Sequence, residues 1–461
     1  MDNTRERFDA IVIGAGQAGP GVAGHLAGRG DRVALIEQDT VGGTCLNRGC
    51  RPTKALRASA RVAQLARTAR AHGVITGDVR MDFPAAVARK DEMIDNWVDG
   101  YTDFLEHTDG LSLIRGRARF TGTGADGHRV AVGDRELVAT NVFLNVGTRA
   151  AVPPILGLDA VPWLDNDRIL HLDKLPDHLV VLGGSYVALE FGQMFRRFGS
   201  TVTIIERGPR LASREDDDVA AEITRFLQEE EITIHTGTNV ERVEPTAAGL
   251  RVHTDAAGAI EGSHLLVAVG RTPNTDLLNV ESVGLELDDR GVIKVDGVFR
   301  TAVDGIWALG DINGRGSFTH TSYQDHEIVV DHLTGGTRNA DTRILTYAMF
   351  TDPPLGRVGM SEREARASGR RVLMATFPMN QHNRARLDGE TAGLIKLLVD
   401  ADTDRFLGAA TMGIAGDEII QIVSALMHAD APCRVLAEMM PIHPTVAEFF
   451  PTILNRLKPL E

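Results

Sequence analysis

Residues 8–37, FDAIVIGAGQAGPGVAGHLAGRGDRVALIE, decide the fold class of this chain. An apolar, β-branched run meets the turn Gly14-x-Gly16-x-x-Gly19, a helix of small residues follows, and a second apolar run ends at Glu37. The glycines permit a tight turn and a close approach of a pyrophosphate, while the terminal carboxylate can take ribose hydroxyls. A glycine-rich turn without a ligand is the competing interpretation, and the strand, helix and terminal acid together disfavour it. The stretch therefore predicts a strand–helix–strand unit that binds a dinucleotide.

A second unit of this kind begins near residue 179 and is less regular. Its turn reads Gly183-x-Ser185-x-x-Ala188, in which small residues replace two of the three glycines, and its second strand ends at Glu206. A carboxylate at that position favours a free ribose 2′-hydroxyl and hence NADH. Three nearby arginines could bind the 2′-phosphate of NADPH, so NADPH is not excluded as the donor: Arg207, Arg210 and Arg214.

A pair of cysteines lies in GGTCLNRGCRPTK, residues 42–54. Cys45 and Cys50 are separated by four residues, and a helix that begins near Cys50 favours its thiolate. Lys54 lies one turn further on the same helix face and adds positive charge. A metal site would need further cysteine or histidine ligands nearby, and two inert buried thiols would not explain the surrounding glycines. The pattern therefore indicates a redox-active pair and no metal.

The bulk properties narrow the class of protein. A chain of 461 residues suggests roughly three domains of about 150 residues each. A net charge of −14 disfavours nucleic acid as a partner. No apolar run reaches the length of a transmembrane helix, and the polar N-terminal residues do not resemble a signal peptide, so we expect no membrane association and a cytoplasmic protein. Cys433 has no near partner and is expected to be an ordinary buried thiol.

The rest of the chain supplies the remaining elements. Residues 53–72 and 84–107 are predicted to be helical, with Trp97 and Phe104 packing the second helix. From about Tyr347 the pattern indicates a third, α+β domain.

Five stretches together resemble one known family over nearly the whole chain. They are GGTCLNRGCRPTK at 42–54, GGSYVALE at 183–190, AVGRTPNTDLL at 268–278, GIWALGDI at 305–312 and HPTVAE at 443–448. The chain is similar to the class I pyridine nucleotide–disulfide oxidoreductases, which include dihydrolipoamide dehydrogenase, glutathione reductase and mercuric reductase. The implied fold is α/β, with two Rossmann-like dinucleotide-binding domains and a C-terminal α+β dimerisation domain. The implied boundaries are 1–150 and 273–343 for the two parts of the FAD domain, 151–272 for the NAD(P) domain and 344–461 for dimerisation.

The resemblance also implies a role for individual residues. Cys50 would be the sulfur that contacts the flavin, and Cys45 the sulfur that attacks the substrate. Lys54 would pair with Glu190 near the flavin, and Tyr186 would lie at the nicotinamide pocket. The implied FAD site comprises Gly14, Gly16, Gly19, Glu37, Thr44, Lys54, Ala118, Gly147, Asp311 and Thr319. The implied nicotinamide-nucleotide site comprises Gly183, Ser185, Tyr186, Glu206 and Gly270.

His443 and Glu448 are implied to be the acid–base pair. Pro444 disfavours helix at His443 and holds it extended, and Glu448 could orient the imidazole and raise its basicity. In the family this histidine reaches the cysteines of the other subunit, so the resemblance implies a homodimer.

The chain departs from the family pattern in three places. Arg51 replaces a small apolar residue after Cys50, residues 318–323 are bulkier than usual, and residues 455–461 lack the paired cysteines of mercuric reductases. The predicted function is an FAD-dependent NAD(P)H:disulfide oxidoreductase that acts on a small disulfide. A mercuric-reductase-like metal-ion, quinone or oxidant reductase remains an alternative, as does a flavoprotein subunit that docks to a partner complex.

Overall fold

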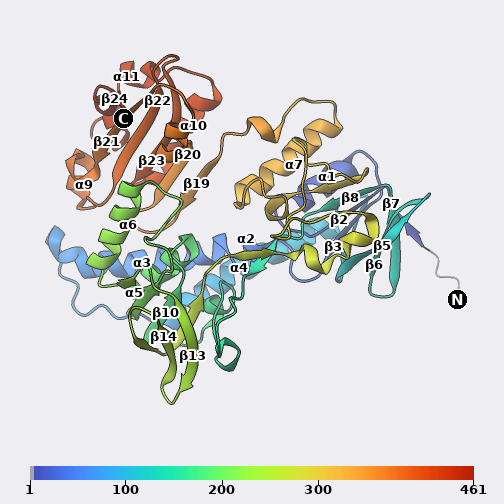
Figure 1. Cartoon of the computed structure of the whole chain (residues 1–461), viewed down its shortest axis with the longest axis horizontal. Coiled ribbons are helices and arrows are strands. Elements are labelled where there is room, and N and C mark those ends of the chain that lie inside the picture. The colour runs from blue at the N-terminus through green and yellow to red at the C-terminus, as the bar shows by residue number, and fades with distance from the viewer. Residues whose placement is uncertain (1–4, 461) are drawn as a thin grey trace. The chain divides into compact units, whose positions relative to one another are not determined.

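The computed structural model describes residues 5–460, and this part of the chain divides into two compact units (Figure 1). The first unit comprises residues 5–55, 87–151 and 270–343. The second comprises residues 56–86, 152–269 and 344–460. Each unit is therefore assembled from segments that lie far apart in the sequence.

A five-stranded parallel sheet in the order β18-β8-β2-β3-β4 forms the centre of the first unit. Its strands are β2 (Ala10–Ile13), β3 (Val33–Glu37), β4 (Leu111–Arg115), β8 (Asn141–Leu144) and β18 (Ile306–Ala308). Every residue of β2 and β3 is buried, which explains their continuous apolar sequence. Helices α1 (Gly19–Gly28) and α7 (Thr319–Leu333) pack side by side in this unit (Figure 1).

Two smaller sheets complete the strands of the first unit. One has the order β1-β7-β6-β5, and the other pairs β9 with β17. Their strands are β1 (Glu6–Arg7), β5 (Ala118–Gly124), β6 (Gly127–Val132), β7 (Arg135–Ala139), β9 (Thr148–Ala150) and β17 (Arg271–Pro273).

The helices around the cysteine pair are α2 (Gly43–Asn47), α3 (Cys50–Thr68) and α4 (Phe83–Glu106). The two predicted helices are confirmed, and α3 begins at Cys50 as expected. The prediction that Trp97 and Phe104 pack α4 is wrong, because these side chains are 40% and 62% exposed. The buried face of α4 is instead formed by residues three or four apart: Phe83, Ala86, Lys90 and Ile94.

The segment 152–269 of the second unit repeats the parallel design. Its sheet has the order β12-β11-β10-β16, and a three-stranded antiparallel sheet, β13-β14-β15, accompanies it. The strands are β10 (His178–Leu182), β11 (Thr201–Ile205), β12 (Thr233–His235), β13 (Val240–Thr246), β14 (Gly249–Thr254), β15 (Ala259–Gly262) and β16 (His264–Val267). The helices are α5 (Tyr186–Phe198) and α6 (Asp217–Glu229).

A six-stranded antiparallel sheet in the order β19-β20-β23-β22-β21-β24 forms the C-terminal part of the same unit. Its strands are β19 (Thr346–Met349), β20 (Leu355–Gly359), β21 (Val372–Pro378), β22 (Leu394–Asp400), β23 (Arg405–Met412) and β24 (Lys458–Pro459). The helices are α8 (Glu362–Ala367), α9 (Asn383–Asp388), α10 (Gly416–His428), α11 (Arg434–Glu438) and α12 (Phe450–Leu454), and α10 packs on β20 and β23.

These elements confirm the predicted fold class of two parallel-sheet domains followed by an α+β domain. The four residue ranges predicted for the domains stay a prediction. Cys433 is buried as expected, and burial raises its pKa to about 12. Within residues 5–460, no helix combines the length and the apolar character that crossing a bilayer requires.

Candidate active site

The first glycine turn is shaped so tightly that two of its glycines cannot be replaced. Gly14 has a φ of +104°, and a Cβ placed there would lie 2.3 Å from the backbone oxygen of Asn145. A Cβ at Gly19 would lie 2.0 Å from the backbone oxygen of Gly14. The absence of side chains at these positions therefore lets a pyrophosphate approach the backbone of the turn closely.

Asn145, which the sequence motifs did not single out, stabilises this turn through side-chain hydrogen bonds. Its Oδ1 atom accepts hydrogen bonds from the N–H groups of Ala18 and Gly19 at 3.3 and 3.0 Å. Its Nδ2 atom donates to the carbonyl of Leu309 at 3.2 Å. The only sequence signal was a polar residue directly after the apolar strand β8.

Glu37 places its carboxylate against the same turn, as the motif predicted. Oε2 accepts from the N–H of Ala15 at 2.8 Å and Oε1 accepts from the N–H of Asp39 at 2.9 Å, and the residue is 9% exposed. Each carboxylate oxygen has further acceptor capacity, so a ribose diol can still donate to it. This donor and acceptor set fits the adenosine end of FAD.

Asp311 offers a second acceptor for a polyhydroxylated ligand. The hydroxyl of Thr148 donates to its Oδ2 atom at 3.1 Å. Burial raises the pKa of Asp311, and the nearby charge of Arg271 opposes this only in part. A desolvated carboxylate gains from further hydroxyl donors, so Asp311 fits the ribityl chain of FAD, as the resemblance implied.

Cys45 and Cys50 lie in hydrogen-bond contact as free thiols. Cys50 is exposed and its Sγ atom lies 3.0 Å from the hydroxyl of Thr319, while Cys45 is half-buried. The hydrogen bond with Cys50, together with burial, raises the pKa of Cys45 well above its usual range, and contributions from Thr319 and Arg51 oppose this only in part. Cys45 therefore keeps its proton in this pairing, and its attack on a substrate needs a base.

The short helix α2, which carries Cys45, is fixed by a residue that sequence reasoning missed. The Nδ2 atom of Asn47 donates to the carbonyls of Val41 and Gly43 at 2.9 and 3.0 Å. A Cβ at Gly49 would lie 2.8 Å from the carbonyl oxygen of Thr44. These contacts set the position of α2, and hence of Cys45, against the start of α3.

The second glycine turn repeats the geometry of the first. Gly183 has a φ of +109°, and a Cβ there would lie 2.5 Å from the carbonyl oxygen of Ala268. Ser185 precedes the first residue of α5, and the Oε1 atom of Glu206 accepts from the N–H of Gly208 at 2.6 Å. This arrangement suits the adenosine ribose and pyrophosphate of a nicotinamide nucleotide.

Tyr186, the first residue of α5, is anchored to a buried carboxylate. Its hydroxyl donates to the Oε1 atom of Glu215, and the hydroxyl of Tyr347 donates to the same oxygen at 2.9 Å. Burial, followed by the charge of Glu215, raises the pKa of Tyr186 and of Tyr347, so both phenols stay protonated donors. The Tyr186 ring is therefore held by Glu215 and Tyr347, which come from two different segments of the second unit.

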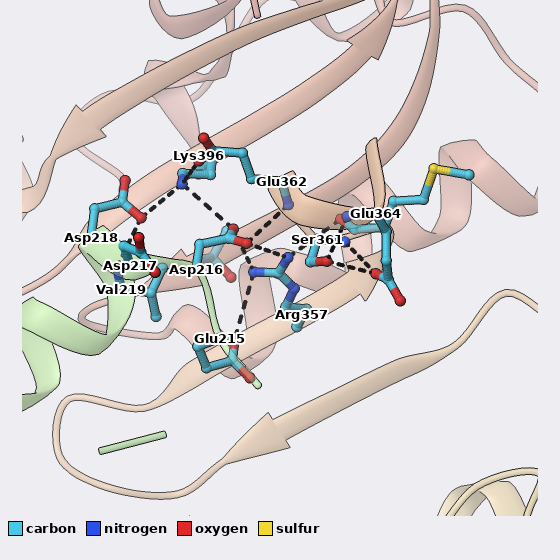
Figure 2. Close-up of polar contacts among 12 residues, drawn as sticks. Glu215, Asp216, Asp217, Asp218, Val219, Arg357, Ser361, Glu362, Glu364 and Lys396 are labelled. Carbon is cyan, nitrogen blue, oxygen red and sulfur yellow. Dashed lines mark hydrogen bonds and ion pairs between the residues drawn. The ribbon is translucent and has the colours of Figure 1, made fainter. Parts of the chain in front are cut away.

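Glu215 also belongs to a larger network of charged side chains (Figure 2). Arg357, 2% exposed, donates to Asp216 at 2.9 Å and to Glu215 at 3.5 Å. The Nζ atom of Lys396 lies 2.7 Å from Asp218 Oδ1 and 2.6 Å from Glu362 Oε2. Although the carboxylates of Asp216, Asp218 and Glu362 are close enough to share a metal ion, the cation that they share is this ammonium.

His443 and Glu448 are brought together as predicted. The Nδ1 atom of His443 donates to the Oε2 atom of Glu448 at 2.8 Å, because a carboxylate can only accept. The imidazole is 71% exposed and the carboxylate only 10%. The carboxylate thus orients an exposed ring and leaves its Nε2 atom for proton transfer.

In other predicted pairs the two residues belong to different units, and these pairings stay predictions. Cys45, Cys50 and Lys54 belong to the first unit, whereas Glu190 and His443 belong to the second. Within its own unit, Glu190 accepts a hydrogen bond from the N–H of Phe350 at 2.8 Å.

The remaining predicted residues all lie in the first unit, including Gly270, so its place in the nicotinamide-nucleotide site stays a prediction. Gly147, with a φ of +62°, follows β8, and Gly270, with a φ of +146°, precedes β17. A Cβ at either position would meet no atom within 4 Å, so open space lies beside them. Thr44 lies in α2, Ala118 begins β5 and Thr319 begins α7.

Comparison with known proteins agrees with this geometry. Residues 8–325 match the family model of the pyridine nucleotide-disulphide oxidoreductases, and residues 345–453 match the model of that family's dimerisation domain. The dimerisation domain indicates that the protein is a homodimer.

Relatives match the chain over nearly its whole length. It is 36% identical to the probable pyridine nucleotide-disulfide oxidoreductase RclA of Escherichia coli, over 98% of this chain and 100% of the relative. It is 32% identical to the dihydrolipoyl dehydrogenase of Cupriavidus necator, with 96% of each chain covered. The solved Cu(II) complex of the HOCl-induced flavoprotein disulfide reductase RclA from Escherichia coli has a TM-score of 0.89 at 35% identity, over 98% of this chain and 100% of that chain.

The chain therefore belongs to the pyridine nucleotide-disulfide oxidoreductase family, as an FAD-dependent enzyme that uses NAD(P)H and carries the family's dimerisation domain.

Proposed function

We propose that this enzyme reduces a small disulfide at the Cys45–Cys50 pair with electrons from NAD(P)H. The observation that carries the proposal is the hydrogen-bond contact of two free thiols where α3 begins, with Cys50 exposed and Cys45 half-buried. When bound, FAD supplies the two-electron transfer from the nicotinamide to the disulfide form of this pair. The chain's own residues then carry out the exchange with the substrate.

The exchange needs no other reactant. The Cys45 thiolate forms a bond to one substrate sulfur, the substrate S–S bond breaks, and the first thiolate product leaves. The Cys50 sulfur then bonds to Cys45, which releases the second thiolate product and leaves a Cys45–Cys50 disulfide. For each disulfide RSSR, one NAD(P)H and one proton are consumed and two RSH are formed.

The protons pass through His443 in this proposal. Because the hydrogen bond with Cys50 raises the pKa of Cys45, a base must remove the thiol proton of Cys45 before it attacks. The Nδ1–H bond to Glu448 leaves Nε2 of His443 as the acceptor, and the same nitrogen returns the proton to the first leaving thiolate. The second thiolate takes the proton that Cys50 gives up. We propose that His443 of one subunit serves the cysteines of the other.

The nucleotide site supports a preference for NADH. The Glu206 carboxylate lies at the second glycine turn, and it would repel a 2′-phosphate. Of the three arginines that could bind such a phosphate, Arg210 already pairs with Asp217 and donates to the carbonyls of Ser213 and Glu215. We expect a lower KM for NADH than for NADPH, and we expect the enzyme to work in the cytoplasm, where the thiol pair stays reducible.

A second candidate function follows from one comparison. The Escherichia coli relative is described as HOCl-induced and has been solved as a Cu(II) complex. Reduction of a metal ion or another oxidant by the same thiols or by the flavin is therefore the alternative. Because the chain is an enzyme of this family, a subunit that only docks to a partner complex is no longer proposed.

Steady-state assays with NADH and NADPH separate the two functions. The acceptors are lipoamide, a panel of small disulfides, Cu(II) and a quinone. We expect disulfides to be reduced, and we expect C45S and C50S to lose this activity by about a thousandfold while FAD stays bound and NADH can still reduce it. The control is C433A, which changes a buried thiol of the C-terminal sheet region and should keep the activity.

Two outcomes would contradict the proposal. Disulfide reduction by C50S at the parental rate would exclude the thiol mechanism. Reduction of Cu(II) or the quinone, with no disulfide reduced, would establish the alternative instead.

A further inference from the structure

Arg51 is an exposed cation directly beside the redox pair. It follows Cys50 in the first turn of α3, and its Cζ atom lies 4.7 Å from the centroid of the Trp97 ring. No carboxylate or hydrogen-bond acceptor within residues 5–460 pairs with its guanidinium. The arginines on either side differ, because Arg48 pairs with Asp39 and Arg57 donates to the carbonyl of Thr351.

The contact with Trp97 holds the guanidinium and leaves its edge available. The guanidinium carbon lies over the Trp97 ring, and a cation–π contact of this kind occupies no hydrogen-bond acceptor, so the N–H groups can still donate to a ligand. Trp97 itself is 40% exposed, so the stacked pair lies at the surface. Such a guanidinium loses little side-chain entropy when it binds a ligand, because the ring already restricts it.

The charge of Arg51 reaches the sulfur that is proposed to attack the substrate. It lowers the pKa of Cys45, against the larger opposing contributions of the Cys50 hydrogen bond and burial. The same charge lowers the pKa of Tyr101, although burial raises that pKa overall. Tyr101 and Trp97 both lie in α4. The guanidinium therefore lies close enough to Cys45 for its charge to act on that sulfur.

We propose that Arg51 is a specificity-determining residue that selects disulfides with a carboxylate close to the S–S bond. The inference rests on the proposed disulfide reduction and names its substrate class. A guanidinium binds a carboxylate through two parallel hydrogen bonds, and it repels an ammonium at the same position. Because the protein carries a net charge of −14, an anionic substrate needs a local cation of this kind to approach the thiols.

Two matched substrates test the proposal on the FAD-loaded dimer. 3,3′-Dithiodipropionate carries two carboxylates and cystamine carries two ammonium groups on chains of similar length. We expect the wild-type enzyme to favour the dianion in kcat/KM, and R51M to reduce this ratio roughly tenfold or more, mainly through KM. The variant R51K keeps the charge and should retain most of the preference, and added salt should weaken the preference.

A second measurement does not depend on turnover. Iodoacetate is an anion and iodoacetamide is neutral, and both alkylate thiolates. We expect R51M to lower the ratio of their rates at Cys45 roughly three- to fivefold, as measured by mass spectrometry of the reduced protein. A purely structural role in stacking on Trp97 would change both rates alike and leave the ratio unmoved.

The outcomes separate this inference from the proposed function. If both disulfides are reduced but R51M leaves the substrate ratio and the alkylation ratio unchanged, the inference is wrong and the disulfide reductase stands. If the wild-type enzyme reduces neither disulfide nor any other of the panel, the proposed function fails and the inference falls with it.

Discussion

The Oδ1 atom of Asn145 accepts a hydrogen bond from the backbone N–H of Gly19 at 3.0 Å, and so ties the end of one strand to the first turn of α1. The same oxygen accepts from the N–H of Ala18, and the residue is 6% exposed. One buried amide therefore satisfies two N–H groups that open the helix, which have no partner within it. This contact holds the turn at which we expect the FAD pyrophosphate to bind.

Replacing Asn145 should weaken both folding and cofactor retention. In N145L the two N–H groups lose their buried acceptor, which costs about 1–3 kcal/mol for each unsatisfied group. We expect a lower melting temperature by circular dichroism and a larger fraction of free FAD after gel filtration. The control is N141A, because Asn141 lies at the start of the same strand and is only half-buried. Equal FAD loss in both variants would contradict this role.

The Tyr186–Glu215 hydrogen bond should matter for nicotinamide binding. In Y186F the ring loses its anchor beside the nucleotide turn, and in E215Q the anchor loses its charge. We expect either change to raise the KM for NADH roughly two- to tenfold with a smaller effect on kcat, because an ordered side chain becomes mobile.

The double variant and a matched control test this coupling. The effects of Y186F and E215Q on KM should combine to less than their sum, since both changes weaken the same hydrogen bond. Y347F removes the other phenol from Glu215 and should leave the KM for NADH within twofold. Additive effects of Y186F and E215Q would show that the two residues act separately.

The His443–Glu448 pair should act only in the exchange with the substrate. H443Q removes the proposed base and should lower kcat for disulfide reduction by roughly 10²- to 10⁴-fold. E448Q leaves the ring in place without its charged partner, and a smaller loss is expected. Stopped-flow measurement of flavin reduction by NADH should show no change in either variant. The control H428Q replaces a histidine at the end of α10 that bonds to the carbonyl of Ser424 in the C-terminal part of the second unit. A slower reduction of the flavin in H443Q would contradict the assignment.

Asp216 should make the second unit sensitive to acid. Burial raises its pKa, but the hydrogen bond and charge of Arg357 and the charge of Lys396 outweigh this, so the pKa is lowered. A carboxyl whose pKa is lower in the folded state stabilises the fold above its unfolded pKa, and this stabilisation is lost as the pH falls through the folded pKa.

We therefore expect D216N to be destabilised by about 3–5 kcal/mol at pH 7, because Arg357 loses the nearer of its two buried carboxylate partners. The gap between D216N and the wild-type protein should narrow as the pH is lowered below about 4, the usual pKa of an aspartate. Thermal melting followed from pH 7 to pH 3 measures both effects. The neighbouring Asp217 is 97% exposed and pairs with Arg210 at the surface, so D217N should change stability by less than about 1 kcal/mol. A gap that stays constant with pH would refute the argument.

Residues near one another in the chain were predictable from the sequence. The turn from Gly14 to Gly19, the start of α3 at Cys50 and the pairing of His443 with Glu448 each depend on local geometry. Glycine conformations, helix starts and short-range side-chain contacts are set by a few consecutive residues, so their signal survives without the fold.

Contacts between distant segments were decided only by the tertiary structure. Asn145 reaches the glycine turn, Glu215 joins Tyr186 to Tyr347, and Arg51 stacks on Trp97, and in each case the partners are tens of residues or more apart. The amphipathic pattern wrongly assigned Trp97 to a packed face, because a sequence shows which side chains are apolar but not which neighbour covers them. The sequence by itself determined that a cysteine pair follows a dinucleotide-binding unit. The tertiary structure alone decided which charges surround that pair, because charges act through space and the chain brings them together only when it folds.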